Sequence, residues 1–326
     1  MARFPFPMPF GWYQVAFPQE IAAGEVKPLR YFGRDLVLWR DDDGAAHVQD
    51  AICPHLGAHL GYGGSVKGGN IVCPFHGWEF DGVGACADIP YSDKVNRKAR
   101  LHTYPVVERN GFLLAWYHPF DAPPSWEIPV IDEVGTPEFS DYMTSDFTVK
   151  SALQEMAENT VDLAHFQYVH GTDEVAVVEA YELDGPFNTM LSVQKYVTPK
   201  GVVDGRIDVH GYGPGFSTTH FSGIIAALLV ATSTPIDDET AHVRFNFTVR
   251  RKPDGSVPRL AELFVAMINQ QMNEDIPIWE HKQHLVVPAL ADTDGPIMTF
   301  RRFYSQFYAE GDGVAAPDLV GVGSPY

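Results

Sequence analysis

Two short patterns of cysteine and histidine constrain this 326-residue chain more than any other feature. Cys53-Pro-His55 is followed, after seventeen residues, by Cys73-Pro-Phe-His76. Thiolate and imidazole are the ligands that soft and borderline metals prefer. Each pair lies among glycines and prolines, which allow tight turns. We therefore predict two loops that approach each other and direct four ligands to one metal site.

The metal at this site is open to two interpretations. A structural zinc site also uses two cysteines and two histidines, but zinc ribbons and fingers usually pair Cys with Cys and His with His. Here each pair combines one cysteine with one histidine. Mixed pairs favour a binuclear iron–sulfur cluster in which the cysteines hold one iron and the histidines hold the other.

The length and composition indicate a globular protein of about two domains. The net charge of −19 argues against a general nucleic-acid-binding protein, because such proteins need basic surface to displace counterions. The three cysteines are an odd number, which favours reduced thiols or metal ligands over a disulfide framework. Neither a signal peptide nor an apolar run of membrane-spanning length is apparent. We expect a cytoplasmic protein without a membrane span.

Proline and glycine spacing divides the chain into four predicted parts. Short β-prone segments separated by glycines predict a small all-β domain over residues 1–120. A proline-rich stretch, 121–130, is the expected linker to a second domain over 131–310. The final segment, 311–326, is rich in Gly, Ala and Pro, and we expect a flexible tail or an inter-subunit arm.

The second domain is predicted to combine strands with two helices. Residues 151–164 lack Gly and Pro and predict one helix. Alternating apolar and polar residues predict strands between about 180 and 250. A second helix is expected near 258–275, with Pro277 ending or restarting it. Its apolar stripe is interpreted as core and consists of Leu260, Leu263, Phe264, Met267, Ile268 and Met272.

A second group of candidate metal ligands lies at the end of the helix expected at 151–164. His165 and His170 are five residues apart and can converge only if the helix ends, tightens or bulges between them. Asp162 lies three residues before His165 and shares its face. Two histidines and one carboxylate with open positions opposite form the site of non-haem Fe(II) oxygenases. The third ligand must then be a distant carboxylate, and the candidates are Glu274, Asp275, Asp292 and Asp294.

The two groups together resemble the α subunit, the terminal oxygenase, of Rieske non-haem iron oxygenases. The first group, followed by Gly77-Trp78, matches the Rieske [2Fe-2S] motif, and the resemblance extends from about residue 11 to 310. Within that family the chain is most similar to the oxygenase component of 3-ketosteroid 9α-hydroxylases. The matching stretches are Glu158-Asn159-Thr-Val-Asp162-Leu-Ala-His165-Phe, Asp275-Ile-Pro-Ile-Trp279-Glu-His-Lys282, Asp294-Gly-Pro296 and Arg301-Arg302-Phe-Tyr304-x-Gln306-Phe-Tyr308.

The resemblance implies an α+β architecture, with an all-β Rieske [2Fe-2S] domain and a helix-grip catalytic domain in which an antiparallel sheet wraps a long helix. It implies one cluster iron on the two cysteines and the other on the two histidines. It also implies a mononuclear Fe(II) on His165, His170 and Asp294, although Asp292 is only slightly less suited from the residues alone. The implied cluster ligands are Cys53, His55, Cys73 and His76.

Two further residues take roles from the resemblance. Asp162 is expected to link a Rieske histidine to an iron-binding histidine across a subunit boundary in a homotrimer, consistent with carboxylates that orient metal-bound imidazoles. Asn159 is expected either to hydrogen-bond within this bridge or to cap the helix. The implied partners are a ferredoxin-type reductase that delivers electrons from NAD(P)H, and O2 as co-substrate.

The resemblance implies monooxygenation of a steroid or similar polycyclic apolar substrate. A sterol desaturase or an oxidative O- or N-demethylase uses the same metals and is the alternative. A more remote alternative is a non-catalytic zinc- and lipid-binding protein, which iron and sulfide analysis would distinguish.

Overall fold

The computed structural model of the chain describes residues 3–309 except 173, 199 and 200. Its contacts divide the chain into two compact units. The first unit comprises Trp12–Tyr117 and Asp121–Ser125, and the second comprises the segment up to Gly11, His118–Phe120 and the chain from Trp126 onward. The predicted tail at 311–326 lies outside the described residues.

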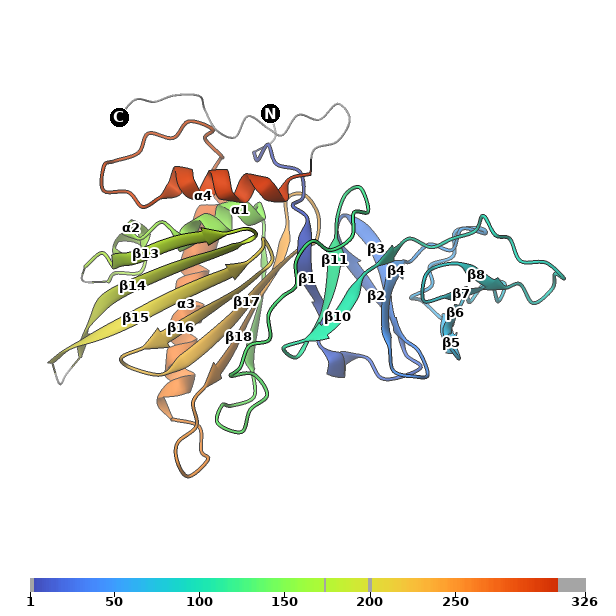
Figure 1. The fold of residues 1–326 in the computed structure, drawn as a ribbon, viewed down its shortest axis with the longest axis horizontal. Coiled ribbons are helices and arrows are strands. Elements are labelled where there is room, and N and C mark those ends of the chain that lie inside the picture. The colour runs from blue at the N-terminus through green and yellow to red at the C-terminus, as the bar shows by residue number, and fades with distance from the viewer. Residues whose placement is uncertain (1–2, 173, 199–200, 310–326) are drawn as a thin grey trace. The chain divides into compact units, whose positions relative to one another are not determined.

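The first unit is built from short antiparallel strands (Figure 1). They form three sheets, in the orders β1-β11-β10, β2-β3-β4-β9 and β5-β6-β7-β8. Phe32 and Gly33 both have positive φ, which produces a tight turn between β2 and β3 that follows the twist of the strands. The elements are β1 Gly11–Ala16, a 3-10 turn η1 Pro18–Glu20, β2 Val26–Tyr31, β3 Arg34–Arg40, β4 Ala46–Asp50, β5 Ser65–Lys67, β6 Asn70–Val72, β7 Glu79–Asp81, β8 Cys86–Asp88, β9 Thr103–Tyr104, β10 Val106–Arg109 and β11 Phe112–Tyr117. The prediction of an all-β first domain is confirmed.

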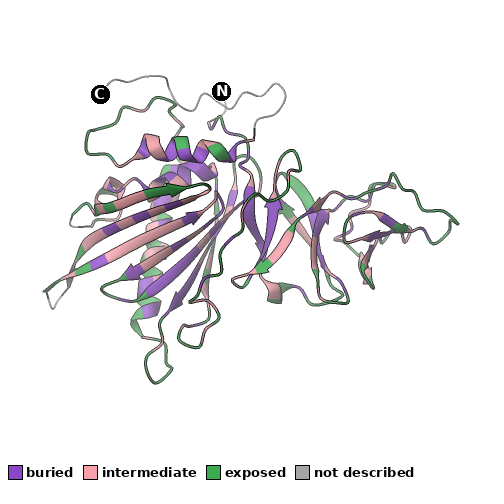
Figure 2. Cartoon of the chain, in the orientation of Figure 1, coloured by how far each residue is buried: buried purple, intermediate pink, exposed green. Residues whose placement is uncertain are grey.

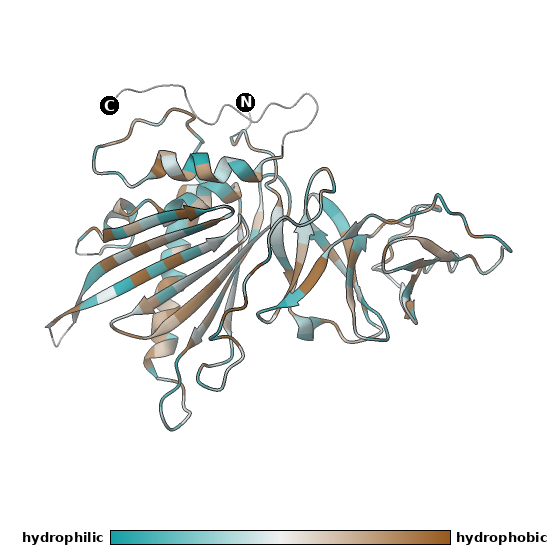
Figure 3. Cartoon of the chain, in the orientation of Figure 1, coloured by the Kyte–Doolittle hydropathy of each residue, from teal (hydrophilic) through white to brown (hydrophobic). Residues whose placement is uncertain are grey.

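The second unit is an antiparallel sheet of seven strands that curves around one long helix, α3 (Figure 1). The strand order is β12-β18-β17-β16-β15-β14-β13. Hydrophobic and hydrophilic residues alternate along β14 and β15, as expected for strands with one face inward (Figure 3). The strands are β12 Met143–Val149, β13 Val177–Asp184, β14 Phe187–Thr198, β15 Gly201–Tyr212, β16 Phe216–Ser222, β17 Ala227–Pro235 and β18 Ala241–Val249. The helices are α1 Leu153–Ala157, α2 Ala164–Tyr168, α3 Leu260–His281 and α4 Ile297–Tyr304, with 3-10 turns η2 Glu158–Thr160 and η3 Ser305–Phe307. The helix-grip prediction is confirmed.

Helix α3 differs from the prediction in two respects. It continues through Pro277 to His281, so the proline neither ends nor restarts it. Only part of the predicted apolar stripe is core: Phe264 and Met272 are buried, whereas Leu263 and Met267 are exposed. Both buried and exposed residues occur along the helix (Figure 2). The buried part packs on sheet residues such as Phe221, because one side of a helix can face the sheet and the other cannot.

The single helix predicted at 151–164 is instead broken into α1, the 3-10 turn η2 and α2. Helix α2 ends at Tyr168, between His165 and His170. This end of the helix is the change in geometry that the five-residue spacing of the two histidines requires.

The N-terminal segment belongs to the second unit rather than to the first, in contrast to the expected boundary at residue 120. The Phe6 ring stacks on Tyr308 at a centroid distance of 5.4 Å. The Phe10 N–H donates to the Phe307 carbonyl at 2.8 Å. The segment is therefore held by the same aromatic residues that follow α4. Among the described helices, none is both long and apolar enough to cross a membrane.

A buried ionic network holds the broken helix in place. Arg301 on α4 donates two hydrogen bonds to the Glu158 carboxylate, at 2.5 and 2.9 Å, and a third to the Leu285 carbonyl at 2.6 Å. The Glu155 carboxylate contacts His284 Nδ1 at 2.6 Å and Lys282 Nζ at 2.7 Å. Burial alone would raise the pKa of Glu155, but the His284 and Lys282 contacts outweigh it and lower this pKa. The glutamate therefore stays charged in the protein interior.

Candidate functional site

The two Cys/His loops of the first unit repeat one hydrogen-bond pattern. The Cys53 N–H donates to the Ala58 carbonyl, and the Gly57 N–H donates back to the Cys53 carbonyl, at 2.8 and 3.0 Å. Cys73 makes the same pair of bonds with Trp78 and Gly77, at 2.8 and 3.0 Å. Gly57 and Gly77 adopt positive φ angles of 80° and 73°, which side chains disfavour. The glycine after each ligand pair is therefore required by the turn that directs the ligands.

These loops bring the four predicted ligands together, with the two cysteines side by side and the two histidines side by side. Cys53 and Cys73 are both buried in the core of the unit. The His55 and His76 rings lie with their centroids 4.7 Å apart. The His55 ring also stacks on Trp78 at 4.4 Å, and the Trp78 Nε1–H donates to the Tyr91 hydroxyl at 2.7 Å. Two thiols on one side and two imidazoles on the other are the donor set of a Rieske cluster.

Two observations indicate that this site is built for a metal group. Burial, together with the neighbouring Cys73 thiol, raises the pKa of Cys53 to about 11, so a thiolate here needs positive charge beside it. The His76 Nδ1 atom is buried and has no hydrogen-bond partner among the described residues. Buried polar atoms are normally paired, and a metal ion would satisfy this nitrogen. The residues present therefore fit a [2Fe-2S] cluster.

The second unit brings three further ligands together. His165, His170 and Asp275 each offer one ligand atom, and these atoms all lie within 4.8 Å of one another. His165 comes from α2, His170 follows the end of α2, and Asp275 comes from α3. The closest of these contacts joins His170 Nε2 and the Asp275 carboxylate at 3.4 Å. Two imidazoles and one carboxylate form the set that binds non-haem Fe(II).

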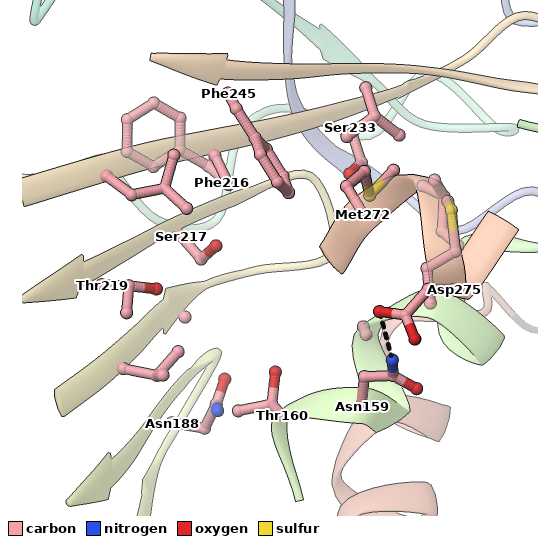
Figure 4. Close-up of a pocket in the computed structure, with 18 of the residues that line it drawn as sticks. Asn159, Thr160, Asn188, Phe216, Ser217, Thr219, Ser233, Phe245, Met272 and Asp275 are labelled. Atoms are coloured by element: carbon pink, nitrogen blue, oxygen red, sulfur yellow. Dashed lines mark hydrogen bonds between the residues drawn. The ribbon is translucent and has the colours of Figure 1, made fainter. Parts of the chain in front are cut away.

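Neighbouring side chains fix the orientation of these ligands. The Asn159 amide donates to Asp275 Oδ2 at 3.2 Å (Figure 4). The Trp279 Nε1–H donates to Asn159 Oδ1 at 3.3 Å. His170 Nδ1 contacts the Glu274 carboxylate at 2.9 Å, which leaves Nε2 to face the other ligands. The Asp162 main-chain carbonyl contacts His165 Nδ1 in the same way. Such outer partners select the tautomer of a metal-binding histidine.

The electrostatics of the group favour a bound cation. Burial lowers the pKa of His165, and this outweighs the opposing effect of the nearby Asp275 charge. Burial also raises the pKa of Asp275 despite the two neighbouring imidazoles. A neutral imidazole and a carboxylate that needs a counter-charge are the states in which these groups bind a metal.

The structure places Asp294 away from this group. Its carboxylate is exposed and accepts a hydrogen bond from the Ala291 N–H at 2.8 Å, within its own turn. Asp292 is exposed as well. The two histidines lie beside Asp275 because α3 passes the end of α2, whereas the Asp294 carboxylate bonds within its own turn; Asp294 as an iron ligand stays a prediction. Asp162 lies next to His165, and its carboxylate accepts the His165 N–H at 3.3 Å.

The position of Asp275 on its helix is a feature of the sequence that favours it among the four candidate carboxylates. Asp275 lies three residues after Met272 and four before Trp279, both of which are buried. It therefore continues the inward face of α3. A charged residue on the buried stripe of a helix is rare unless it is paired or binds a metal.

The three ligands line one end of a cavity of about 270 Å³ between the sheet and α3. This volume is near the lower end of the range for small-molecule sites, about 300–1,000 Å³. Much of the lining is apolar and comes from the concave face of the sheet, from α3 and from α4. Examples are Val209, Phe216, Leu229, Phe245, Met272 and Phe300.

Two family models match the chain, one in each unit. The Rieske [2Fe-2S] domain model matches residues 11–105. The model described as the 3-ketosteroid 9alpha-hydroxylase C-terminal domain matches residues 115–308.

Curated relatives match over nearly the whole chain. A probable 3-ketosteroid-9-alpha-monooxygenase oxygenase component of Rhodococcus rhodochrous is 31% identical, over 95% of this chain and 82% of its own length. A cholesterol 7-desaturase of Ciona intestinalis is 30% identical, over 93% of this chain and 69% of its own length.

Solved structures share the fold at lower identity. Dicamba monooxygenase bound to 3,6-dichlorosalicylic acid aligns with a TM-score of 0.75 and 22% identity, over 91% of this chain and 96% of that one. The Pseudomonas putida CBB5 NdmA QL mutant with caffeine aligns with a TM-score of 0.71 and 19% identity, over 93% and 97% of the two chains.

Proposed function

The chain belongs to the Rieske non-haem iron oxygenases, in the family defined by the 3-ketosteroid 9α-hydroxylase C-terminal domain, and from this premise we propose that it hydroxylates a steroid or similar polycyclic apolar molecule. It is an oxidoreductase and the terminal oxygenase component of a multicomponent system. The observation that carries the substrate proposal is the apolar cavity that ends at His165, His170 and Asp275.

We assign the ligands of the two metal groups from the contacts described above. Cys53 and Cys73 would hold one iron of the [2Fe-2S] cluster, and His55 and His76 the other. The mononuclear Fe(II) would be held by His165, His170 and Asp275. When bound, the cluster supplies single electrons and the Fe(II) supplies activation of O2.

The protein's own residues prepare the site for this chemistry. Asn159 and Glu274 hold Asp275 and His170 in fixed orientations through the hydrogen bonds described above. The apolar walls, such as Phe245, offer few partners to water, which favours contact between an apolar substrate and the iron ligands. A dry, closely fitting site limits the side reactions of reactive oxygen species.

Electrons are proposed to come from a ferredoxin-type reductase that uses NAD(P)H, and the active form is proposed to be a homotrimer. The loops that carry His55 and His76 expose two large apolar residues, Leu56 at 66% and Phe75 at 61%. Exposed apolar residues beside a redox centre suit contact with another protein surface. We propose the cytoplasm as the location, since none of the three cysteines forms a disulfide.

The function is tested by product mass. Iron-loaded protein is incubated with a surrogate ferredoxin-type reductase, NADH, O2 and a panel of 3-ketosteroids and sterols. A gain of one oxygen atom supports hydroxylation. A loss of two hydrogen atoms points to desaturation, the second candidate, which the similarity to a cholesterol 7-desaturase favours. An unchanged steroid panel, with iron content and cluster reduction verified, contradicts the steroid proposal and directs the search to methoxy-aromatic and other polycyclic substrates.

Asp162→Asn is expected to retain both metals and to lose most turnover. The asparagine oxygen can still accept the His165 N–H, so the local turn is preserved. The negative charge that would link His165 to a cluster histidine of another subunit is removed, and changes of this kind cost about 10–100-fold. Turnover, iron and labile sulfide are measured beside Asp184→Asn, an exposed residue of β13. Full activity with intact metal content would exclude the proposed role of Asp162.

A further inference from the structure

The concave floor of the cavity carries a short row of polar side chains opposite the iron ligands. Asn188 on β14 pairs with Gly211 on β15, and Gly211 pairs with Ser217 on β16. Thr219 lies two residues beyond Ser217 and therefore on the same face of its strand. All three side chains line the cavity and point into it (Figure 4).

These three side chains have no hydrogen-bond partner of their own. Within the described part of the chain, no side-chain hydrogen bond is formed by Asn188, Ser217 or Thr219. Asn188 is nevertheless buried, with 8% of its surface exposed. Their neighbours on the opposite face are paired: the Thr218 hydroxyl bonds to Tyr212 at 3.4 Å, and the Thr189 hydroxyl to His210 at 3.1 Å. Because these unpaired polar groups face the cavity, we expect a bound ligand to supply their missing hydrogen bonds.

Gly211 gives this row its shape. A Cβ atom at Gly211 would overlap the Asn188 amide oxygen, so the Asn188 side chain occupies the space that a side chain at 211 would fill. The missing side chain thus makes room for the Asn188 amide group over β15, the strand next to the one that carries the Ser217 hydroxyl group.

The charges of the lining restrict what can bind. Asp275 is the one carboxylate among the described residues that line the cavity, and none of them is a lysine or an arginine. Apart from the metal proposed at the His165, His170 and Asp275 end, an anionic substrate would find no counter-charge there, and its burial would be unfavourable. A neutral molecule that is apolar except for a ketone or hydroxyl oxygen matches the lining.

Building on the proposed function, we propose that Asn188, Ser217 and Thr219 form a subsite that hydrogen-bonds the ketone or hydroxyl oxygen of a neutral polycyclic substrate. The oxygen is held at the sheet, and the carbon to be oxidised is thereby held at the His165, His170 and Asp275 end. The subsite binds and orients, and no bond of the substrate is made or broken there.

The test compares two steroids that differ in one carbonyl oxygen, 5α-androstan-3-one and 5α-androstane. Binding to the iron-loaded full chain is followed by the fluorescence of Trp279, which lines the cavity. The wild-type protein is expected to bind the ketone at least about tenfold more tightly than the hydrocarbon. Asn188→Leu, Ser217→Ala and Thr219→Val are each expected to reduce this ratio by about threefold or more. The hydrocarbon affinity should stay unchanged, which also verifies that each variant is folded.

The matched control is Ser222→Ala, at the exposed end of β16 and outside the cavity, which should keep the wild-type ratio. A ratio near one in the wild type, or an unchanged ratio in all three variants, overturns the subsite. Because binding is measured without turnover, a lack of oxygenated product would count against the proposed function and not against the subsite. If the wild type binds neither steroid, the steroid class is contradicted, and the same comparison with 2-decalone and decalin decides the subsite.

Discussion

Replacement of Asp275 by alanine is expected to remove the mononuclear iron while the [2Fe-2S] cluster remains. Asp275 is the carboxylate whose ligand atom lies within 4.8 Å of those of His165 and His170. Loss of a direct ligand should exceed the 10–100-fold loss of metal affinity that follows from changing an outer partner, so a decrease of more than about 100-fold is expected. Iron and labile sulfide per chain, and turnover, are the measurements.

Asp294→Ala is the matched comparison. Its carboxylate closes its own exposed turn, so this variant should keep its iron and most of its activity. The opposite pattern, with iron lost from Asp294→Ala and retained by Asp275→Ala, would show that the carboxylate ligand is misassigned.

Stability gives an independent measurement for Asp275→Ala. Burial raises the pKa of Asp275, so in metal-free protein above that pKa the charged carboxylate opposes folding. The metal-free variant should therefore unfold at a midpoint no lower than that of the metal-free wild type. A loss of iron through misfolding would instead lower this midpoint.

Arg301→Met is expected to destabilise the second unit strongly. The side chains of Arg301 and Glu158 are only 5% and 8% exposed, and the variant would leave the Glu158 charge buried without its partner. Lys282 Nζ would remain 4.0 Å from the Glu158 carboxylate, a longer contact than the one removed. Breaking one side of a buried ion pair costs about 3–5 kcal/mol. The measurement is the free energy of unfolding of the second unit in urea.

Arg302→Met provides the control for the Arg301 experiment, since Arg302 is exposed and its side chain bonds to Thr299 nearby on the helix. The Arg302 carbonyl also accepts a hydrogen bond from the Ser305 hydroxyl, which the replacement leaves in place. The variant should change the free energy of unfolding by no more than about 0.5 kcal/mol. A second variant, Glu158→Leu combined with Arg301→Met, removes both charges and should recover most of the stability lost in Arg301→Met. If Arg301→Met and Arg302→Met change the free energy of unfolding equally, the Arg301–Glu158 ion pair does not stabilise the unit.

The features predictable from the sequence are those set by nearby residues. The Cys/His loops could be inferred because each ligand pair and its glycine lie within a few positions of one another, for example Cys73 and Gly77. The break between His165 and His170 followed from helix geometry. The alternation in β18 could be read directly from the chain.

Which carboxylate binds the iron depends on how distant segments pack, and it stays a prediction: the resemblance implies Asp294, whereas Asp275 lies beside the two histidines. Asp275 is more than a hundred positions from either histidine, and only the passage of α3 beside α2 brings it to them. Both Asp275 and Asp294 lie in stretches similar to the family pattern, and the resemblance favours Asp294, whereas the packing of the helices brings Asp275 to the histidines. The exposure of Leu263 and Met267 was missed for a related reason: periodicity marks an apolar face but not how much of it the sheet covers.

The glycine at position 211 has a consequence for how such a scaffold diversifies. Its φ angle is not in the left-handed region, so the backbone at Gly211 can accept a larger residue once Asn188 turns aside. Side chains on the cavity face take no part in the hydrogen bonds between strands, so the pairing of β14, β15 and β16 would survive the exchange. Descendants of one ancestral sheet could therefore acquire new ligands through single replacements on its floor. The same fold occurs, at about 20% identity, in proteins solved with molecules as different as a chlorinated benzoic acid derivative and caffeine.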